Sequence, residues 1–333
     1  MTRRDSCGFR PGRMRWRWLL RPNSLSGVNP DDGLGPVEML VSLLRPKTVE
    51  SKIISGAGEW SVREPRYADP AFCVMLEGSC VLRLDGYHPI ELHAGDFMLL
   101  TDMPEFVMSS GHGAMSTVLA AGPVNGVARH GDPDGPASMR MLGGYFRFER
   151  ENAPLLAPLL PRIVLVRHDE PRASRLSRIV ALISEETGSA APSELILVRL
   201  VEVLLVEAMR LRAAPVEGVE RGLVAGLDDP VLAPALRKMH TDIAFGWTVE
   251  RLARAAGVSR AVFAERFSRT MGMPPMQYLA QWRMALAKEM LRTEDVSIAE
   301  VARRTGYLSA SAFTTAFTRM TGTSPSAFAR ASV

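Results

Sequence analysis

Apolar residues recur at helical spacing in the last third of the chain, and the same arrangement is written twice. Each copy predicts a short helix, a glycine turn and a second helix with two phenylalanines four residues apart. Ser or Thr stands where each helix begins, which is typical of an N-cap. The matching pairs are Leu252/Val301, Ala253/Ala302, Gly257/Gly306, Phe263/Phe313 and Phe267/Phe317, and the caps are Thr248, Ser259, Ser297 and Ser309.

A small residue four positions before each glycine allows the second helix to cross closely over the first. One copy alone would fit a generic pair of antiparallel helices, but the repetition favours two helix-turn-helix units, whose second helices enter the major groove of DNA. Residues 276–292 between the copies predict one helix of about 25 Å. The two recognition helices are then expected about 34 Å apart, one turn of B-DNA.

The pattern changes in the N-terminal half. Residues 50–122 predict short strands separated by glycine turns at about ten-residue spacing, which indicates an antiparallel barrel or sandwich. Residues 172–186 and 193–213 then predict two helices. The predicted fold class is α+β multidomain: an N-terminal antiparallel β-barrel with following helices, and a C-terminal all-α domain of two helix-turn-helix units.

The helix predicted at 193–213 is apolar along two stripes, and both must be buried. Either one stripe packs on the barrel and the other on a second subunit, or both lie inside one monomer. The first alternative predicts a homodimer through this helix, with Leu204 and Leu205 in the interface. The stripes are Leu195, Val198, Val201, Leu205 and Met209, and Leu197, Leu200, Leu204 and Ala208.

These patterns divide the chain into five parts. Residues 1–36 are rich in Arg, Gly and Pro without periodicity, which predicts a disordered arm or a start assigned too early. A sensor barrel is expected over 37–170, dimerisation helices over 171–214 and a linker over 215–230, which holds three glycines and two prolines. The double helix-turn-helix domain is expected over 231–333.

Composition and charge narrow the class of protein. With 333 residues, 47% hydrophobic and 23% charged, the chain fits a globular protein of about two domains. The sequence holds no run of 18 apolar residues, so no membrane span is expected. Residues 226–333 carry 14 basic and 9 acidic side chains, whereas residues 37–225 carry 19 and 24. A basic C-terminal third predicts a polyanionic partner.

The C-terminal third of the chain resembles a known family of proteins. Residues 227–330, and above all "RMALAKEMLRTEDVSIAEVARRTGYLSASAFTTAFTRMTGTSP", are similar to the DNA-binding domain of AraC/XylS-family transcriptional regulators. Residues 39–213 resemble, less specifically, the cupin-type sensor and dimerisation helices of that family. The resemblance implies a cytoplasmic regulator with double-stranded DNA, a second copy, RNA polymerase and a small organic effector as partners.

The resemblance and the helical pattern together give the residues expected to contact DNA. Val262, Phe263 and Phe267 are expected on the buried face of the first recognition helix, and the opposite face is expected to read DNA. Glu265 can accept from cytosine N4, whereas the second helix offers short hydroxyls and methyls. Arg260 and Arg319 are expected on phosphates. The expected DNA contacts are Arg260, Ala261, Ala264, Glu265, Ser268, Ala310, Ser311, Thr314, Thr315 and Arg319.

Strand parity gives the residues expected to face the effector. An inward carboxylate at Glu105 would need a partner such as Arg83, a water or a cationic group on a ligand; alternatively, Glu105 faces solvent at a strand end. The expected pocket residues are Cys73, Met75, Cys80, Leu82, Glu105 and Val107.

The alternative function is a cupin enzyme, a metal-dependent oxygenase or isomerase fused to a DNA-binding domain. Such enzymes need three or four converging ligands. Cys73 and Glu105 stand where histidines would be required, and His88 and His93 are an odd number of residues apart on one strand. The sequence therefore predicts no metal, no cofactor and no catalytic residues. A two-residue turn at Glu77-Gly78 would pair Met75 with Cys80. Cys73 would then lie diagonally across from Cys80 on the neighbouring strand, and the two cysteines would be too far apart for a disulfide.

Overall fold

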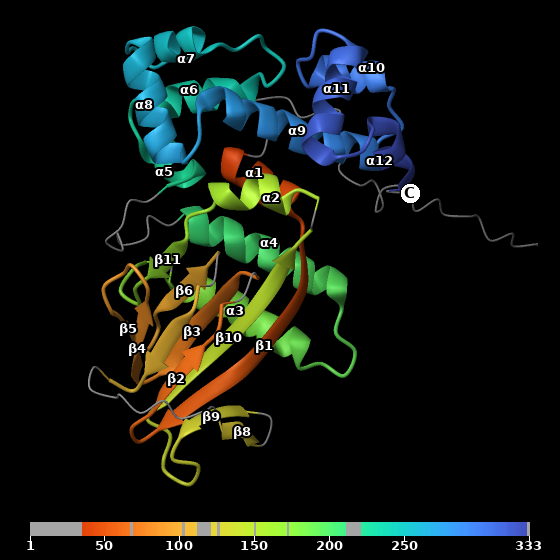
Figure 1. The fold of residues 1–333 in the computed structure, drawn as a ribbon. Coiled ribbons are helices and arrows are strands. Elements are labelled where there is room, and N and C mark those ends of the chain that lie inside the picture. Colours follow the sequence, from red (N-terminus) through yellow and green to blue (C-terminus); the bar gives the residue numbers. More distant parts are fainter. Residues whose placement is uncertain are drawn as a thin grey trace, which may run out of the picture.

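The computed structural model describes residues 35–66, 69–101, 104–111, 121–124, 127–149, 151–171, 173–210 and 221–331. Its N-terminal half is built on strands and its C-terminal third consists of helices (Figure 1). The predicted α+β class, with a strand-rich N-terminal part and a C-terminal all-α domain, is therefore confirmed. The predicted N-terminal arm lies outside the described residues up to position 34.

Two β-sheets face each other across an apolar core in the N-terminal half. The larger sheet has the order β11 (Ile163–Val166), β6 (Phe97–Leu100), β3 (Ala71–Glu77), β10 (Met139–Phe148), β1 (Pro46–Ala57), β9 (Val127–Gly131), β8 (Ala121–Val124). The smaller sheet has the order β2 (Ser61–Glu64), β7 (Phe106–Ser109), β4 (Ser79–Leu84), β5 (Ile90–His93).

The expected barrel is not closed, because the strands divide between two separate sheets in the described part of the chain. The pairing expected between Met75 and Cys80 is also wrong. Met75 on β3 pairs with Met141 of the larger sheet, whereas Cys80 on β4 pairs with Leu92 of the smaller one. The chain changes sheet at Gly78 instead of folding back as a hairpin. One pair, β1 with β9, is parallel, although an antiparallel arrangement was expected.

Helices cover the outer face of the larger sheet and its upper end (Figure 1). Helices α3 and α4 contact β1 on that face, and α1 packs against α4. These helices are α1 (Pro36–Leu44), α2 (Ala153–Leu156), a 3-10 turn (Ala157–Leu159), α3 (Ala173–Thr187) and α4 (Glu194–Arg210). The two helices predicted between the barrel and the linker are therefore present, and residues 211–220 beyond them lie outside the described residues.

Helix α4 buries members of both apolar stripes inside one chain. Its buried apolar residues are Leu197, Val201, Leu204, Leu205, Ala208 and Met209. Leu204 and Leu205, which were expected in a subunit interface, have 0% exposure and belong to the core of the monomer. The exposed apolar residues are Leu195, Ile196 and Val203. A contact that α4 makes with a second subunit would therefore use these residues and not the predicted pair.

The C-terminal third folds as two helix pairs joined by one long helix, as predicted (Figure 1). Its helices are α5 (Leu223–Asp228), α6 (Leu232–Thr241), α7 (Val249–Ala255), α8 (Arg260–Met271), α9 (Pro275–Thr293), α10 (Ile298–Arg304), α11 (Ala310–Thr321) and α12 (Pro325–Ala331). Helix α5 lies within the segment expected to be a linker and packs against α6 and α8. No described helix is long and apolar enough to cross a membrane.

The local signals read from the repeat are confirmed. Each of the four predicted caps, Thr248, Ser259, Ser297 and Ser309, accepts a hydrogen bond from the backbone N–H three residues later. The four repeated phenylalanines are fully buried, and Ala253 and Ala302 lie under the crossing helices with 2% and 1% exposure. Burying one aromatic ring at such a site stabilises a domain by about 3–5 kcal/mol relative to alanine.

The two turn glycines give a testable contrast. Gly257 and Gly306 both have left-handed backbones, with φ of 71° and 75°. An added Cβ meets nothing within 4 Å at Gly257, but at Gly306 it lies 2.5 Å from Ala244 O and 2.6 Å from Arg283 Nη2. Both alanine variants should be destabilised by about 1–2 kcal/mol in free energy of unfolding, because alanine disfavours the left-handed backbone. Gly306→Ala should be destabilised more, because the added Cβ also clashes with the backbone oxygen of Ala244, which cannot move away easily. Urea unfolding of both full-length variants tests this, and equal losses would contradict it.

Candidate nucleic-acid interface and ligand cavity

The two recognition helices, α8 and α11, present the predicted DNA-reading residues on their outer faces. Arg260, Ala261, Glu265, Ser311, Thr315 and Arg319 are exposed, and Ala264, Ser268, Ala310 and Thr314 are partly exposed. The buried face of α8 is made by Phe263, Phe267 and Met271. Val262 is 49% exposed and was wrongly expected on that face. It lies one residue, about 100° around the helix, from the ring of Phe263.

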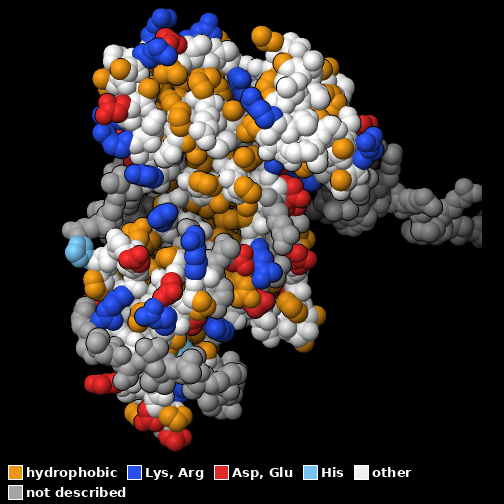
Figure 2. All heavy atoms as spheres, viewed as in Figure 1, with side chains coloured by type: hydrophobic (Ala, Val, Ile, Leu, Met, Phe, Trp, Pro, Cys, Tyr) orange, Lys and Arg blue, Asp and Glu red, His pale blue; other side chains and the backbone are white. Residues whose placement is uncertain are grey.

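Some charged side chains of α8 are held in ion pairs, whereas others are exposed without one. Arg266 is fixed by Asp229 at 2.7 Å, and the same carboxylate accepts hydrogen bonds from the N–H groups that begin α6. Glu265 and Arg269 are both exposed, and no ion pair joins these two described side chains. Arg260 pairs with Glu250 at 2.7 Å on the surface, where such a pair is weak and open to exchange. Figure 2 shows Lys and Arg side chains spread over the visible face of this helical part.

Arg283, in the middle of α9, ties the first helix-turn-helix unit to the second. Its Nε donates to Ile243 O at 2.9 Å and its Nη2 to Phe245 O at 2.8 Å, both in the loop before α7. Its Nη1 donates to Gly306 O, at the turn of the second unit, at 3.4 Å. One planar guanidinium therefore spans both units, which favours a fixed angle between them. No local pattern in the sequence indicates this role of Arg283.

A charged cluster joins α9 to the strand-rich N-terminal half. Arg292 pairs with Glu289 on its own helix and with Glu149, which directly follows β10. Arg45, at the end of α1, pairs with Glu289 and lies 3.9 Å from Glu149. The side chains of Glu149, Glu289 and Arg292 are only 12–16% exposed. Two positive and two negative groups balance, and removing one would leave a poorly solvated charge unpaired.

Lys288 adds a further contact to this cluster. It is 8% exposed, and its ammonium donates to the backbone carbonyl of Glu151. Burial lowers the pKa of Lys288 from its usual value. We call Arg45, Glu149, Glu289, Arg292 and Lys288 the α9 clamp. It joins the end of β10 to the helix that connects the two DNA-facing units.

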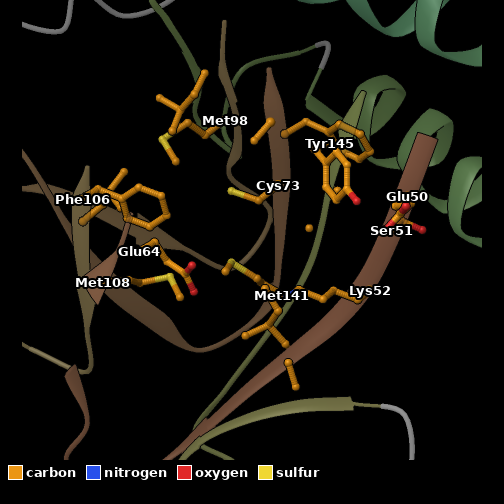
Figure 3. A pocket seen from close by; sticks show the side chains of 18 of the residues that line it. Glu50, Ser51, Lys52, Glu64, Cys73, Met98, Phe106, Met108, Met141 and Tyr145 are labelled. Carbon is orange, nitrogen blue, oxygen red and sulfur yellow. The ribbon is translucent and has the colours of Figure 1, made fainter. Parts of the chain in front are cut away.

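A cavity of about 520 Å³ lies between the two sheets. Its wall is mostly apolar and rich in sulfur, with Cys73, Met98, Met108 and Met141 directed toward the same space (Figure 3). The size and the apolar wall are those of a site for a small organic molecule. Charged and polar residues of β1, β2 and β10 also line it, namely Glu50, Lys52, Glu64, Tyr145 and Arg147.

The structure changes the predicted pocket set. Cys73 and Leu82 line the cavity, whereas Met75 and Cys80 are buried in the packed core between the same sheets. Glu105 and Val107 face the other side of β7, because Phe106 and Met108 are the residues that line the cavity. Glu105 is exposed and pairs with Arg63, not with Arg83. Which residues of β7 point into the cavity could not be inferred from β3 without knowing the lengths of the intervening turns.

Several polar groups of the cavity wall are already engaged. Arg147 pairs with Asp69 at 2.8 Å, and a hydrogen bond between Tyr145 and Glu50 raises the pKa of the Tyr145 phenol. His130 is 3% exposed, and its Nδ1 has no hydrogen-bond partner among the described residues. Burial, followed by the charge of Lys52, lowers the pKa of His130. His130 is therefore neutral at pH 7 and adds no charge to the cavity.

The thiols of Cys73 and Cys80 are free and buried, as expected for cysteines that serve as small apolar residues. Burial raises the pKa of each to about 12, so the reactive thiolate is scarce at neutral pH. Among the described residues, no group of three or more His, Cys, Asp and Glu side chains is placed to hold a metal ion.

Comparison with known families agrees with this arrangement. A Cupin family model matches residues 36–214, and a Helix-turn-helix domain model matches residues 252–331. An AraC-like transcription regulator of Streptomyces lividans is 35% identical over 297 residues, which cover 88% of this chain and 97% of the relative. A second AraC-like transcription regulator, of Streptomyces antibioticus, is 34% identical with the same coverage.

Solved structures include similar chains. ToxT of Vibrio cholerae has 12% identity and a TM-score of 0.32, over 85% of this chain and 96% of its own. The DNA-binding domain of AdpA, solved with a target DNA, has 36% identity and a TM-score of 0.30, over 31% of this chain and 93% of its own. The family assignment rests on the family models and on the relatives that match over nearly their whole length. The chain belongs to the AraC-like transcription regulators, with a cupin-like N-terminal domain and a helix-turn-helix DNA-binding domain.

Proposed function

We propose that this regulator reads two successive major-groove segments with α8 and α11, under the control of a small organic effector held between its sheets. The observation that carries the proposal is the pair of capped helix-turn-helix units whose outer faces remain open. Helix α9 spans about 28 Å for its 19 residues. With part of a unit at each end, this length suits recognition helices one turn of B-DNA apart, about 34 Å.

The two recognition helices differ in what they offer to bases. Glu265 on α8 is exposed and free of an ion pair with Arg269, so it can accept a hydrogen bond from cytosine N4. Helix α11 offers Ser311, Thr314 and Thr315, which suit phosphates and the thymine methyl. The first unit is therefore proposed to supply more of the sequence discrimination. Arg260 and Arg319 are proposed to hold phosphates, which strengthens binding to all sequences alike.

The effector is proposed to act through β10. This strand contributes Met141, Gly143, Gly144, Tyr145 and Arg147 to the cavity wall, and Glu149 of the α9 clamp follows it directly. A ligand that shifts the end of β10 would change the clamp and hence the freedom of α9. The effector then alters DNA affinity only as far as it binds the clamped and released states with different affinity.

A second copy is proposed to bind at the open face of α4. Ile196 and Val203 are seven residues apart and therefore lie on one side of the helix, where they are 47% and 45% exposed. Leu195 beside them is 68% exposed. Three exposed aliphatic side chains on one helix favour an interface between copies.

The remaining assignments follow from membership of this family. The sensor is proposed over 37–170, the dimerisation helices over 171–214 and the DNA-binding domain over 231–333. RNA polymerase is the proposed protein partner and the cytoplasm the proposed location, because the chain acts on promoter DNA. No enzymatic step is part of the proposal, since the relatives are named as regulators of transcription.

Replacing the charged reader on α8 tests the DNA proposal. Glu265→Ala should relax base preference at one position of the first half-site by about 1–3 kcal/mol, because the variant loses an acceptor for one base edge. Arg319→Ala is the matched control and should weaken binding to all DNA sequences about equally, because a phosphate contact carries no base preference. Both variants are measured by selection from a randomised DNA library. An unchanged preference profile for Glu265→Ala would show that Glu265 reads no base.

Introducing charge on α4 tests the dimer. The double variant Ile196→Lys/Val203→Lys should give monomers by light scattering, since it places unpaired charges in the proposed interface. Leu308→Lys, at a fully exposed leucine before α11, is the control and should leave the mass unchanged. Leu204→Lys should instead unfold the chain, because Leu204 is a core residue. A double variant with the mass of the parent protein would place the interface elsewhere.

A further inference from the structure

An acidic side chain enters the apolar cavity from its edge strand. Glu64 ends β2 and lies two residues after Val62, which is buried between the sheets. Across the strands Glu64 pairs with Phe106 and Val62 pairs with Met108, and both partners line the cavity. The alternation of side chains along β2 therefore turns Glu64 inward. Figure 3 shows its carboxylate directed toward the space between Met108 and Met141.

The other charged groups of the cavity wall are neutralised or face water. Arg147 is held by Asp69, and Glu50 is bonded to Tyr145. His130 is neutral, and Lys52 is exposed to solvent. Glu64 is only partly exposed, and it has no hydrogen bond or ion pair with any described residue. Among the described lining residues, it is the acidic group that remains both inward-facing and uncompensated.

An uncompensated carboxylate in an apolar wall is costly unless an opposite charge joins it. The wall around Glu64 suits an organic cation in particular. The ring of Phe106 lies on the neighbouring strand, directly across from Glu64, and the face of an aromatic ring attracts ammonium groups. Met98, Met108 and Met141 provide flexible, polarisable contacts that adapt to apolar bodies of different shape.

We propose that the cavity binds an amphipathic organic cation, with its ammonium group between Glu64 and Phe106 and its apolar body along the methionines. The proposal rests on the proposed function in taking this cavity as the effector site, and it adds the chemical class of the effector. An anionic ligand would have to rely on Lys52, which is exposed to solvent. It would also meet the Glu64 carboxylate inside.

The test compares three ligands that share one alkyl chain. Decyltrimethylammonium, decanoate and 1-decanol are titrated into the full-length chain by calorimetry, each below its micelle concentration. The ammonium compound should bind about 10- to 100-fold more tightly than the alcohol, as a charge-assisted contact would give. Decanoate should bind no more tightly than the alcohol.

Two variants locate the charge that is responsible. Glu64→Gln should bind the ammonium compound and the alcohol about equally, with the alcohol affinity unchanged. Without ligand it should melt at the same temperature as the parent or higher, because it removes an uncompensated charge. Glu105→Gln, which lies directly before β7 and is paired with Arg63 on the surface, is the matched control and should keep the full preference for the cation.

Three results would overturn the proposal. They are a preference for decanoate, an absence of preference in the parent protein, and a preference for the cation that Glu64→Gln retains. The proposed function is tested separately by the affinity of the same chain for its selected DNA with and without the ammonium compound. Cation binding that depends on Glu64 but leaves DNA affinity unchanged would support the site and contradict its role as an effector site.

Discussion

Helix α9 is the constraint on which the rest of this structure depends. It is continuous over 19 residues and carries one helix-turn-helix unit at each end. Arg283 in its middle bonds to backbone carbonyls of both units, so their angle is set by a rigid group as well as by packing. Because a helix resists bending over this length, the distance between the recognition helices is a property of the protein and not of the DNA. In the proposed mode of binding, the protein then selects DNA by the spacing of two half-sites.

The same helix is where the cupin-like half contacts the DNA-binding half. The α9 clamp closes on its last two turns, and Glu149 in that clamp lies next to the strand that lines the cavity. The four ion-paired groups of the clamp, Arg45, Arg292, Glu149 and Glu289, are poorly exposed to solvent and balance in charge. Displacing one of them would leave a poorly solvated charge unpaired, which is costly. Such a contact suits a switch with two discrete arrangements better than a gradual response. Cavity, strand and clamp thus form one continuous physical connection.

The sequence predicted the C-terminal third well, because its signals are local. Caps such as Ser259 and Ser309, the turn glycines and the paired phenylalanines act within one helix pair and are repeated. For the N-terminal half, the sequence predicted only that it is built from short strands followed by helices. Which face of β7 lines the cavity depends on loop lengths and on the sheet that each strand joins, so Glu105 was chosen where Glu64 carries the inward carboxylate. Arg283 and the α9 clamp join residues up to 244 positions apart, and no local pattern reports such contacts.

The spacing of half-sites tests the central claim most directly. The full-length chain is used to select its preferred operator from randomised DNA, and the two half-sites are mapped by footprinting. Five base pairs are then inserted between them, which rotates one half-site by about half a turn. A rigid α9 predicts that the inserted operator binds no better than either half-site alone, with both footprints no longer protected by one chain. Retention of full affinity and of both footprints after the insertion would contradict the account.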